Sequence, residues 1–430
     1  MKLNTIVVLG AGVAGISATY HLPPDKFKVS CYESSNITGG LLAPFFVGNF
    51  RFDRAVHLSF TKDKYVRSLF DNVKHYKHRP DSYCYESEIW LRHPVQNNLF
   101  PLSTEEKVEL ISSFCEAPKS YNDNYQSWLI SQYGQKIAER YPIKYTQRYW
   151  SIDADKLSLT WIGNRLRKAN LSEILYGAFE PRYDNHYYAD EMRYPTEGGY
   201  FSFIKPMVSQ CDIHLDKKAI ELDLISKKVR FNDGDIVAYD NIISSIPLPE
   251  LIGIINDVPE DVKKAAESLL YTKIDLLSVG FSREISNKYL WFYIYDDCVA
   301  ARAYSPSLKS PDAVPKGCSS LQFEVYTLST KSNPNISMLI ENIRSYLIKS
   351  KICGESDILF IDHRQLKYGN VVYDHGMEER RQLVLDFLKE NNIETCGRFG
   401  EWSYLWSDQS LLSGKDAANR VINGSKFPQA

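Results

Sequence analysis

The sequence lacks the features of nucleic-acid-binding and membrane-spanning proteins. Its 51 lysines and arginines nearly balance its 53 aspartates and glutamates, so no net field favours nucleic acid or an anionic membrane. No uninterrupted apolar segment reaches the ~18 residues that a membrane-spanning helix needs, and internal repeats and low-complexity tracts are absent. The composition therefore predicts a folded, soluble protein with neither a nucleic-acid partner nor an integral membrane segment.

Metal-binding and disulfide patterns are also missing. The eight cysteines are scattered without a Cys-x-x-Cys pair, and no histidine has the spacing of a metal ligand. The apolar run after Lys2 contains glycines and lacks a convincing cleavage site, so it predicts a buried strand and turn instead of a signal peptide. We expect no metal and a reducing, cytoplasmic location.

The N-terminus has the pattern of a dinucleotide-binding unit. Residues 5–9 are apolar and mostly β-branched, as in a parallel strand buried on both faces. Gly10, Gly12 and Gly15 follow as G-x-G-x-x-G, and residues 16–22 have helical spacing. In this motif the first glycine permits a tight turn, the second lets the backbone approach a pyrophosphate, and the third lets helix and strand pack closely.

A second strand, predicted at residues 28–32, ends at Glu33, which is followed by Ser34. A carboxylate at this distance from the glycines is placed to accept hydrogen bonds from the adenosine ribose. The pattern predicts a bound dinucleotide. It does not by itself distinguish FAD from NAD.

The continuation through Gly39 and Gly40 resembles the FAD-binding flavoproteins of the amine-oxidase type, in which this glycine pair crosses the pyrophosphate again. Residues 218–222, 228–231 and 241–247 are predicted strands. In that family such a meander rejoins the FAD domain, and the resemblance implies that main chain at Ala219 touches the adenine.

The middle of the chain divides into a helical part and a strand-rich part. Ser103 begins a predicted capping box and helix, and residues 155–166 predict a helix carrying Trp161, Ile162 and Arg165. Between residues 274 and 362 the pattern is of strands, with a helix at 336–350.

The expected fold class is α/β, with a Rossmann-type FAD-binding domain, a helical insert and a mostly antiparallel sheet domain. The length of 430 residues suits two or three domains. The predicted boundaries give a discontinuous FAD-binding domain, a helical substrate domain and a sheet substrate domain, at residues 1–62, 193–247 and 390–430, then 63–192, then 248–389.

The segment from Gly397 to Gly414 resembles that of UDP-galactopyranose mutases, closer to the eukaryotic type, within the superfamily of amine and protoporphyrinogen oxidases. Other patches agree in order and spacing: Phe52 and Asp53 with His57, residues 93–98, residues 161–165, and Trp291 with Tyr293 and Arg302. For the cofactor, the resemblance and the dinucleotide motif together imply contacts from Gly10, Gly12, Gly15, Glu33, Ser34, Gly39, Gly40, His57, Ala219, Gly397, Arg398, Asp408 and Gln409.

For the substrate, the resemblance implies two arginines and several aromatic groups that clamp a nucleotide sugar. Guanidinium groups suit phosphate oxygens because they form paired hydrogen bonds. The expected catalytic residues are His57, Arg165 and Arg302, with His57 near the flavin and not a general base. The expected substrate contacts are His93, Asn97, Arg165, Trp291, Tyr293, Arg302, Asn370, Tyr373 and Tyr404.

The family's chemistry implies a mutase that interconverts pyranose and furanose rings for cell-surface polysaccharide synthesis. Reduced FAD acts as the nucleophile through a flavin N5-sugar adduct, so an external reductant is an expected partner. Two departures leave the sugar open: His93 replaces a tyrosine, and the usual Tyr-Pro pair is missing around Asn370. The expected substrate is therefore given only as a UDP- or dTDP-hexose.

Two alternatives remain open on the sequence. The protein could be an FAD-dependent oxidoreductase of the amine or protoporphyrinogen oxidase kind, although such enzymes do not need two phosphate-clamping arginines. The dinucleotide motif also permits bound NAD, in a mutase or a dehydrogenase. The sequence does not give the oligomeric state, and a homo-oligomer is compatible with it.

Overall fold

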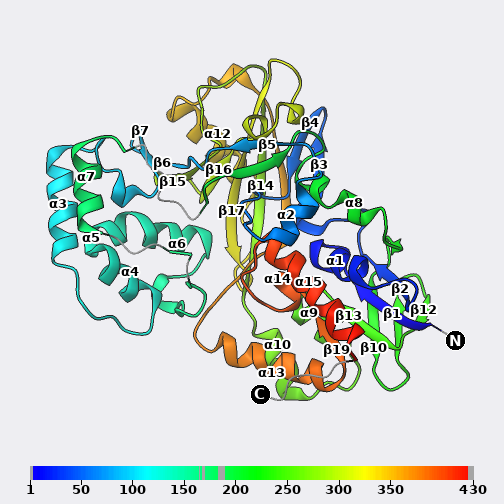
Figure 1. Ribbon diagram of the computed structural model, residues 1–430. Coiled ribbons are helices and arrows are strands. Elements are labelled where there is room, and N and C mark those ends of the chain that lie inside the picture. The colour runs from blue at the N-terminus through cyan, green and yellow to red at the C-terminus, as the bar shows by residue number, and fades with distance from the viewer. Residues whose placement is uncertain (1–2, 164, 167–169, 183–188, 425–430) are drawn as a thin grey trace.

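The computed structural model describes residues 3–163, 165–166, 170–182 and 189–424. Figure 1 shows three parts: a unit built from the two ends of the chain, a central sheet, and a helical part that extends to one side. Mixed α/β architecture with a Rossmann-like unit confirms the predicted fold class. The exact domain boundaries stay predictions.

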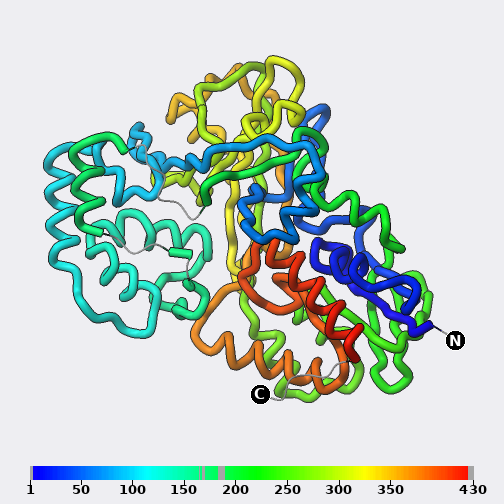
Figure 2. The backbone as a smooth tube through the Cα atoms, in the orientation of Figure 1, coloured from blue at the N-terminus to red at the C-terminus, as the bar shows by residue number. Residues whose placement is uncertain are grey.

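The Rossmann-like unit is a five-stranded parallel sheet of order β19-β13-β1-β2-β9. It is assembled from distant segments, with bounds β1 (Asn4–Leu9), β2 (Phe27–Tyr32), β9 (Ile213–His214), β13 (Asn241–Ser244) and β19 (Ile393–Thr395). The buried apolar side chains of β1 confirm the predicted central strand. Helices α1 (Val13–His21) and α15 (Ser407–Ile422) pack against each other, so the first and last helices lie side by side (Figure 2).

A small antiparallel sheet lies within the same unit, and its strands form the predicted meander. Its strands are β10 (Ala219–Asp223), β11 (Lys228–Phe231) and β12 (Ile236–Ala238). The chain then enters the parallel sheet at β13, beside β1.

The central sheet has seven strands in the order β18-β14-β17-β16-β15-β6-β7. Neighbours are antiparallel except for the parallel pair β15 and β6. The bounds are β6 (Tyr83–Glu86), β7 (Ile89–Arg92), β14 (Tyr271–Phe281), β15 (Trp291–Ile294), β16 (Arg302–Tyr304), β17 (Ser319–Leu328) and β18 (Ile358–Val371). Strands β6 and β7 come from the segment that was expected to be helical, so the sheet and the helical part share a stretch of chain.

The helical part begins with α3 (Thr104–Cys115), where Ser103 and Glu106 form the predicted capping box. The other helices are α4 (Tyr125–Tyr133), α5 (Gln135–Ala138), a π-helical turn (Glu139–Ile143), α6 (Lys144–Tyr149) and α7 (Leu171–Phe179).

The helix predicted at residues 155–166 is wrong for the described residues. Only a single 3₁₀ turn, Ala154–Lys156, forms there, and residues 161–163 are in turns. Leu157 pairs with Asp374 in an isolated bridge, and the Ser158 amide donates to the Tyr373 carbonyl at 2.8 Å. Pairing with a distant extended segment therefore overrides the local helical pattern.

The remaining elements connect these parts. They are α2 (Lys64–Phe70), α8 (Lys205–Val208), α9 (Leu248–Ile252), α10 (Glu260–Glu267), α11 (Pro306–Lys309), α12 (Ile336–Lys349), α13 (Met377–Glu390), α14 (Gly397–Gly400), the hairpin β3 (Pro44–Val47) and β4 (Phe50–Asp53), the pair β5 (His75–His78) and β8 (Met192–Pro195), and 3₁₀ turns at Gly40–Leu42, Val95–Asn97, Tyr200–Phe203, Pro311–Ala313 and Glu355–Asp357.

Across the described ranges, no helix is both long and apolar enough to cross a bilayer. Within the same ranges, no group of three or more histidine, cysteine, aspartate or glutamate side chains is placed to hold a metal ion.

Candidate functional site

A cavity of about 870 Å³ extends from the glycine turn after β1 to the seven-stranded sheet. Most of the predicted site residues line it: Gly10, Gly12, Glu33, Ser34, Gly39, Gly40, His57, Ala219, Trp291, Tyr293, Arg302, Asn370, Gly397, Arg398 and Tyr404. Seven predicted residues are not in its lining: Gly15, His93, Asn97, Arg165, Tyr373, Asp408 and Gln409.

The backbone geometry of the turn after β1 accounts for the glycines in its sequence. Gly10 has a φ of +92°, and a Cβ there would lie 2.6 Å from Ser245 Oγ. A Cβ on Gly15 would lie 1.9 Å from the Gly10 carbonyl oxygen, so Gly15 serves the packing of α1 on the turn. A Cβ on Gly12 would meet no protein atom within 4 Å. Gly12 thus leaves open space at the start of α1, where backbone N–H groups favour an anion.

The second glycine pair lies against the first turn. The Gly39 amide donates to the Ala11 carbonyl at 2.8 Å. A Cβ on Gly40 would come within 3.1 Å of the Gly12 Cα atom. The two glycine segments therefore form one surface of exposed backbone at the cavity wall.

Glu33 is held at the end of β2 by its neighbours. Its Oε2 atom accepts from the Ala11 amide at 2.8 Å, and its Oε1 atom accepts from the Ser35 amide at 2.9 Å. These bonds fix the carboxylate facing the cavity. Ser34 and Ala219 line the same end.

His57 is a neutral imidazole. Its Nε2 atom lies 3.0 Å from the Leu41 carbonyl oxygen, so this nitrogen carries the hydrogen and donates it. Burial lowers the pKa of His57 to about 4, with the charges of Asp53 and Lys309 acting in opposite directions. At neutral pH the ring is a fixed, uncharged wall of the cavity.

The loop containing His57 starts from a buried ion pair. Asp53, the last residue of β4, accepts from Lys309 Nζ at 2.7 Å and from the Tyr194 hydroxyl at 2.7 Å. The side chains of Asp53 and Lys309 are 1% and 0% exposed. Burial opposes ionisation of Asp53, but the Lys309 ammonium keeps the pKa of this carboxyl below its usual value.

Arg302 lines the cavity and is paired with Glu324, which is fully buried. Glu324 also accepts from the Tyr326 hydroxyl at 2.6 Å and from the Val56 amide at 2.8 Å. Burial disfavours a charged Arg302, yet the Glu324 carboxylate holds its pKa well above the ordinary value. Arg302 is therefore a fixed cation, and its partner also anchors the loop that contains His57.

Tyr149, Tyr404 and Asn370 form a chain of polar groups in the cavity wall. The Tyr149 hydroxyl lies 3.0 Å from the Tyr404 hydroxyl and 3.2 Å from Asn370 Oδ1. Among the described residues, the buried Asn370 Nδ2 atom has no hydrogen-bond partner. Burial raises the pKa of Tyr149 well above its ordinary value, so it stays a hydroxyl that can donate. The unsatisfied Asn370 amide beside the Tyr404 hydroxyl is suited to an acceptor-rich ligand.

Arg165 and Tyr373 lie behind Tyr404 and do not line the cavity themselves. Arg165 Nη2 donates to the Tyr404 carbonyl at 2.6 Å, and its guanidinium carbon lies 5.1 Å from the Tyr404 ring centroid. The Tyr373 hydroxyl accepts from the Tyr404 amide at 2.7 Å. In this structure both residues position Tyr404.

His93 and Asn97 lie further from the cavity. The His93 ring centroid is 4.8 Å from that of Tyr293, and burial lowers the pKa of His93 to about 4. Asn97 Nδ2 donates to Glu173 at 2.9 Å. Any influence of His93 on a ligand would pass through Tyr293, which does line the cavity.

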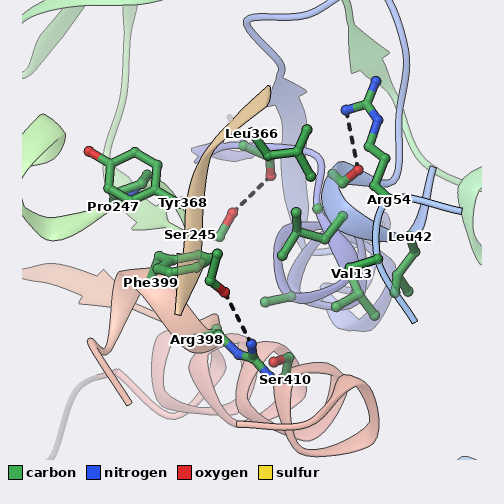
Figure 3. A pocket seen from close by; sticks show the side chains of 18 of the residues that line it. Val13, Leu42, Arg54, Ser245, Pro247, Leu366, Tyr368, Arg398, Phe399 and Ser410 are labelled. Atoms are coloured by element: carbon green, nitrogen blue, oxygen red, sulfur yellow. Dashed lines mark hydrogen bonds between the residues drawn. The ribbon is translucent and has the colours of Figure 1, made fainter. Parts of the chain in front are cut away.

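The C-terminal segment contributes through Arg398, whose Nε donates to the Leu405 carbonyl at 2.8 Å. Gln409 accepts from the Trp406 amide at 2.9 Å and so caps α15. Asp408 and Gln409 lie in the first turn of α15, but their neighbours Ser407 and Ser410 are the residues of this turn that line the cavity. Figure 3 shows Arg398 and Ser410 from these helices, Arg54 from the loop after β4, and Val13 from α1 around the same opening.

Sequence reasoning missed several lining residues. Arg54 stands directly after Asp53 in a segment that had been recognised, so its position was an available signal. Tyr149 and Tyr326 had no such signal, because they meet Arg302 only through tertiary structure. The missed residues of most consequence are Arg54, Tyr149, Ser245 and Tyr326, together with Glu324 behind the wall.

Residues 8–73 match the family of NAD(P)-binding Rossmann-like domains. The whole chain resembles a structure of reduced UDP-galactopyranose mutase, with a TM-score of 0.92, 23% identity, and coverage of 99% of this chain and 96% of the other. The two chains share a fold.

Two further structures share this fold with lower scores. A protein described as a protoporphyrinogen oxidase, from Exiguobacterium sp. 255-15, has a TM-score of 0.74 and 15% identity over 98% of this chain and 99% of its own. Putrescine oxidase bound to putrescine has a TM-score of 0.65 and 13% identity over 98% and 99%.

Proposed function

We propose that the protein is a flavin-dependent mutase that interconverts the pyranose and furanose forms of a UDP- or dTDP-hexose. One observation carries the proposal. A single cavity is lined at one end by the dinucleotide turn with Gly12 and Glu33, and at the other by Arg302, Trp291 and Tyr404. A cofactor and a phosphate-bearing ligand would therefore meet in one space.

The residues present fit FAD. Open space at Gly12 and the packing of Gly40 against it suit a diphosphate that approaches backbone closely. The fixed carboxylate of Glu33 suits a ribose. The neutral His57 ring provides an uncharged wall further along the cavity, against which an isoalloxazine ring could lie.

Reduced FAD, when bound, would supply the nucleophile for the anomeric carbon of the sugar. Arg302 would bind the diphosphate of the substrate and stabilise the negative charge that it gains as the leaving group. Because Glu324 holds this guanidinium in place, little reorganisation is needed when the charge develops.

The tyrosines would act as hydrogen-bond donors. Tyr149 is held protonated by burial and donates to Asn370 Oδ1 at 3.2 Å, so the Tyr404 hydroxyl beside it would be the donor to a phosphate or sugar oxygen. Arg165 and Tyr373 would fix Tyr404 from behind. Holding the displaced diphosphate near the sugar makes its return effectively intramolecular.

Likeness in fold to the mutase extends over nearly the whole of both chains, and it exceeds the likeness to the two oxidases. This order supports the mutase over an amine or protoporphyrinogen oxidase. The sugar stays open because His93 and the segment at Asn370 depart from the family pattern.

The test combines cofactor identification with turnover. Native mass spectrometry should find FAD in the purified protein. After reduction with dithionite, the protein should interconvert a UDP- or dTDP-hexopyranose with its furanose, and chromatography would measure the two forms. The oxidised enzyme is the matched control and should be inactive. A colourless protein that retains NAD would overturn the flavin mechanism. Anaerobic bleaching of a bound flavin by an amine, without isomerisation of any nucleotide sugar, would instead favour an oxidase.

A further inference from the structure

The cavity wall includes several cationic side chains, and Arg54 differs from the others. Lys367 is paired with Glu250 at 2.6 Å, Arg302 with Glu324, and Lys217 with Asp233 and Asp235. Arg398 donates to main-chain carbonyls, and Lys218 is exposed. Arg54 is half-buried, and within the described residues its hydrogen bond is to the Gly40 carbonyl at 3.5 Å, the long limit for such a bond.

The position of Arg54 is fixed by its surroundings. It follows Asp53, whose side chain is locked by Lys309, so the backbone at this point is anchored in the interior. Its guanidinium lies beside Gly40, which packs against Gly12 at the start of α1. Figure 3 shows the side chain of Arg54 and, as a dashed line, its hydrogen bond, whose acceptor is the Gly40 carbonyl. The group is thus next to both glycine segments.

A half-buried guanidinium without a carboxylate contact loses hydration that nothing fully replaces. Burial and the nearby charge of Arg364 lower the pKa of Arg54, while Glu33 acts in the opposite direction. A diphosphate would relieve this cost, because a guanidinium grips phosphate oxygens through paired, charge-assisted hydrogen bonds. The glycine pair itself is followed by Leu41 and Leu42, which bring no charge.

We propose that Arg54 binds the diphosphate of the dinucleotide cofactor, together with the backbone at Gly12 and Gly40. This inference rests on the proposed function only because it requires a bound dinucleotide. It holds for FAD and for NAD, since both contain the diphosphate. Arg54 then supplies the positive charge that the glycine segments lack.

The experiment compares Arg54→Gln with Arg364→Gln in the full-length holoenzyme. Arg364 is a matched control because it lies nearby, contacts Asp362 and the Phe46 carbonyl, and does not line the cavity. The fraction of FAD released during dialysis is measured from the fluorescence of free flavin, and the same assay with NAD absorbance distinguishes the two cofactors. Loss of a charge-assisted contact should weaken retention of the cofactor roughly 10- to 100-fold.

Two further measurements make the test decisive. Retention by the wild type should fall as salt is raised, and Arg54→Gln should reduce this salt dependence more than Arg364→Gln does. Arg54→Lys keeps the charge without the paired donors, so its retention should lie between the wild type and Arg54→Gln. If Arg54→Gln does not fold by circular dichroism, the comparison of Arg54→Lys with Arg364→Lys replaces it.

The outcomes separate this inference from the proposed function. A wild type that binds FAD, with a folded Arg54→Gln that retains it equally well, overturns the role of Arg54 and leaves the mutase intact. A wild type that retains NAD in an Arg54-dependent way supports the role of Arg54 and overturns the flavin mechanism. A wild type that binds neither cofactor overturns both.

Discussion

The Nζ atom of Lys309 lies 2.7 Å from the Oδ2 atom of Asp53, and both side chains are almost completely buried. The aromatic rings of Tyr194 and Tyr304 lie 4.4 and 4.2 Å from the ammonium group. This pair joins α11 to the end of β4. The loop that lines the cofactor end of the cavity begins at the next residue.

Replacing Lys309 with methionine should leave the Asp53 carboxylate buried and unpaired. We expect the free energy of unfolding to fall by about 3 to 5 kcal/mol, as for other buried pairs that lose one member. Urea denaturation would measure the loss. The double variant Asp53→Asn with Lys309→Met should recover a large part of it, and an equal loss in both variants would contradict the charge explanation.

Acid should destabilise the protein through His57 and His93. Burial lowers the pKa of each to about 4, below the ordinary value of 6.5, so between these values the unfolded chain binds more protons than the folded one. Stability is therefore fully present above pH 6.5 and falls as the pH drops towards 4, by up to roughly 3 kcal/mol per histidine.

Unfolding in urea at a series of pH values would measure this slope. His57→Gln should make the slope shallower than that of the wild type. An identical slope in His57→Gln and the wild type would contradict the assignment to this ring.

Alanine at Gly12 should affect cofactor binding, whereas alanine at Gly15 should affect the stability of the fold. Gly12→Ala adds a Cβ that meets no protein atom, so stability without cofactor should change little while cofactor affinity falls. Gly15→Ala adds a Cβ at 1.9 Å from the Gly10 carbonyl, so the fold itself should lose stability by about 1 to 3 kcal/mol. Thermal unfolding with and without added FAD separates the two effects. Equal loss of stability in both apoproteins would argue against a ligand at Gly12.

Arg302→Gln should lower turnover by about 100- to 1,000-fold, because a fixed donor to the leaving diphosphate is lost. Arg302→Lys keeps the charge and should lose less. Arg283→Gln removes an exposed arginine outside the cavity wall and is the control for non-specific effects. Turnover by Arg302→Gln at the wild-type rate, in protein that melts normally, would reject the phosphate clamp.

Local patterns in the sequence were sufficient to predict the dinucleotide-binding unit. The β-branched run before Gly10, the helix after it and Glu33 at the end of the next strand each follow from neighbouring residues. The capping box at Ser103 is also a local device, and the structure has it.

The sequence could not predict contacts between distant segments. Glu324 links Arg302 to Val56, and nothing in the order of these residues indicates it. The helix expected around Trp161 fails for the same reason, since Leu157 pairs with Asp374 more than two hundred residues away. Side chains that define the ligand end of the cavity are thus set by sheet pairing instead of by local propensity.

The parallel sheet has a consequence for the order of synthesis. Strand β19 and helix α15 come from the last part of the described chain, and the Ser17 hydroxyl donates to the Leu411 carbonyl at 2.6 Å. The glycine turn emerges from the ribosome well before its neighbours Gly397, Arg398 and Ser410. Nascent chains that stop short of this segment would expose the apolar face of α1, and the complete cofactor cavity exists only after residues 397–410 have been made.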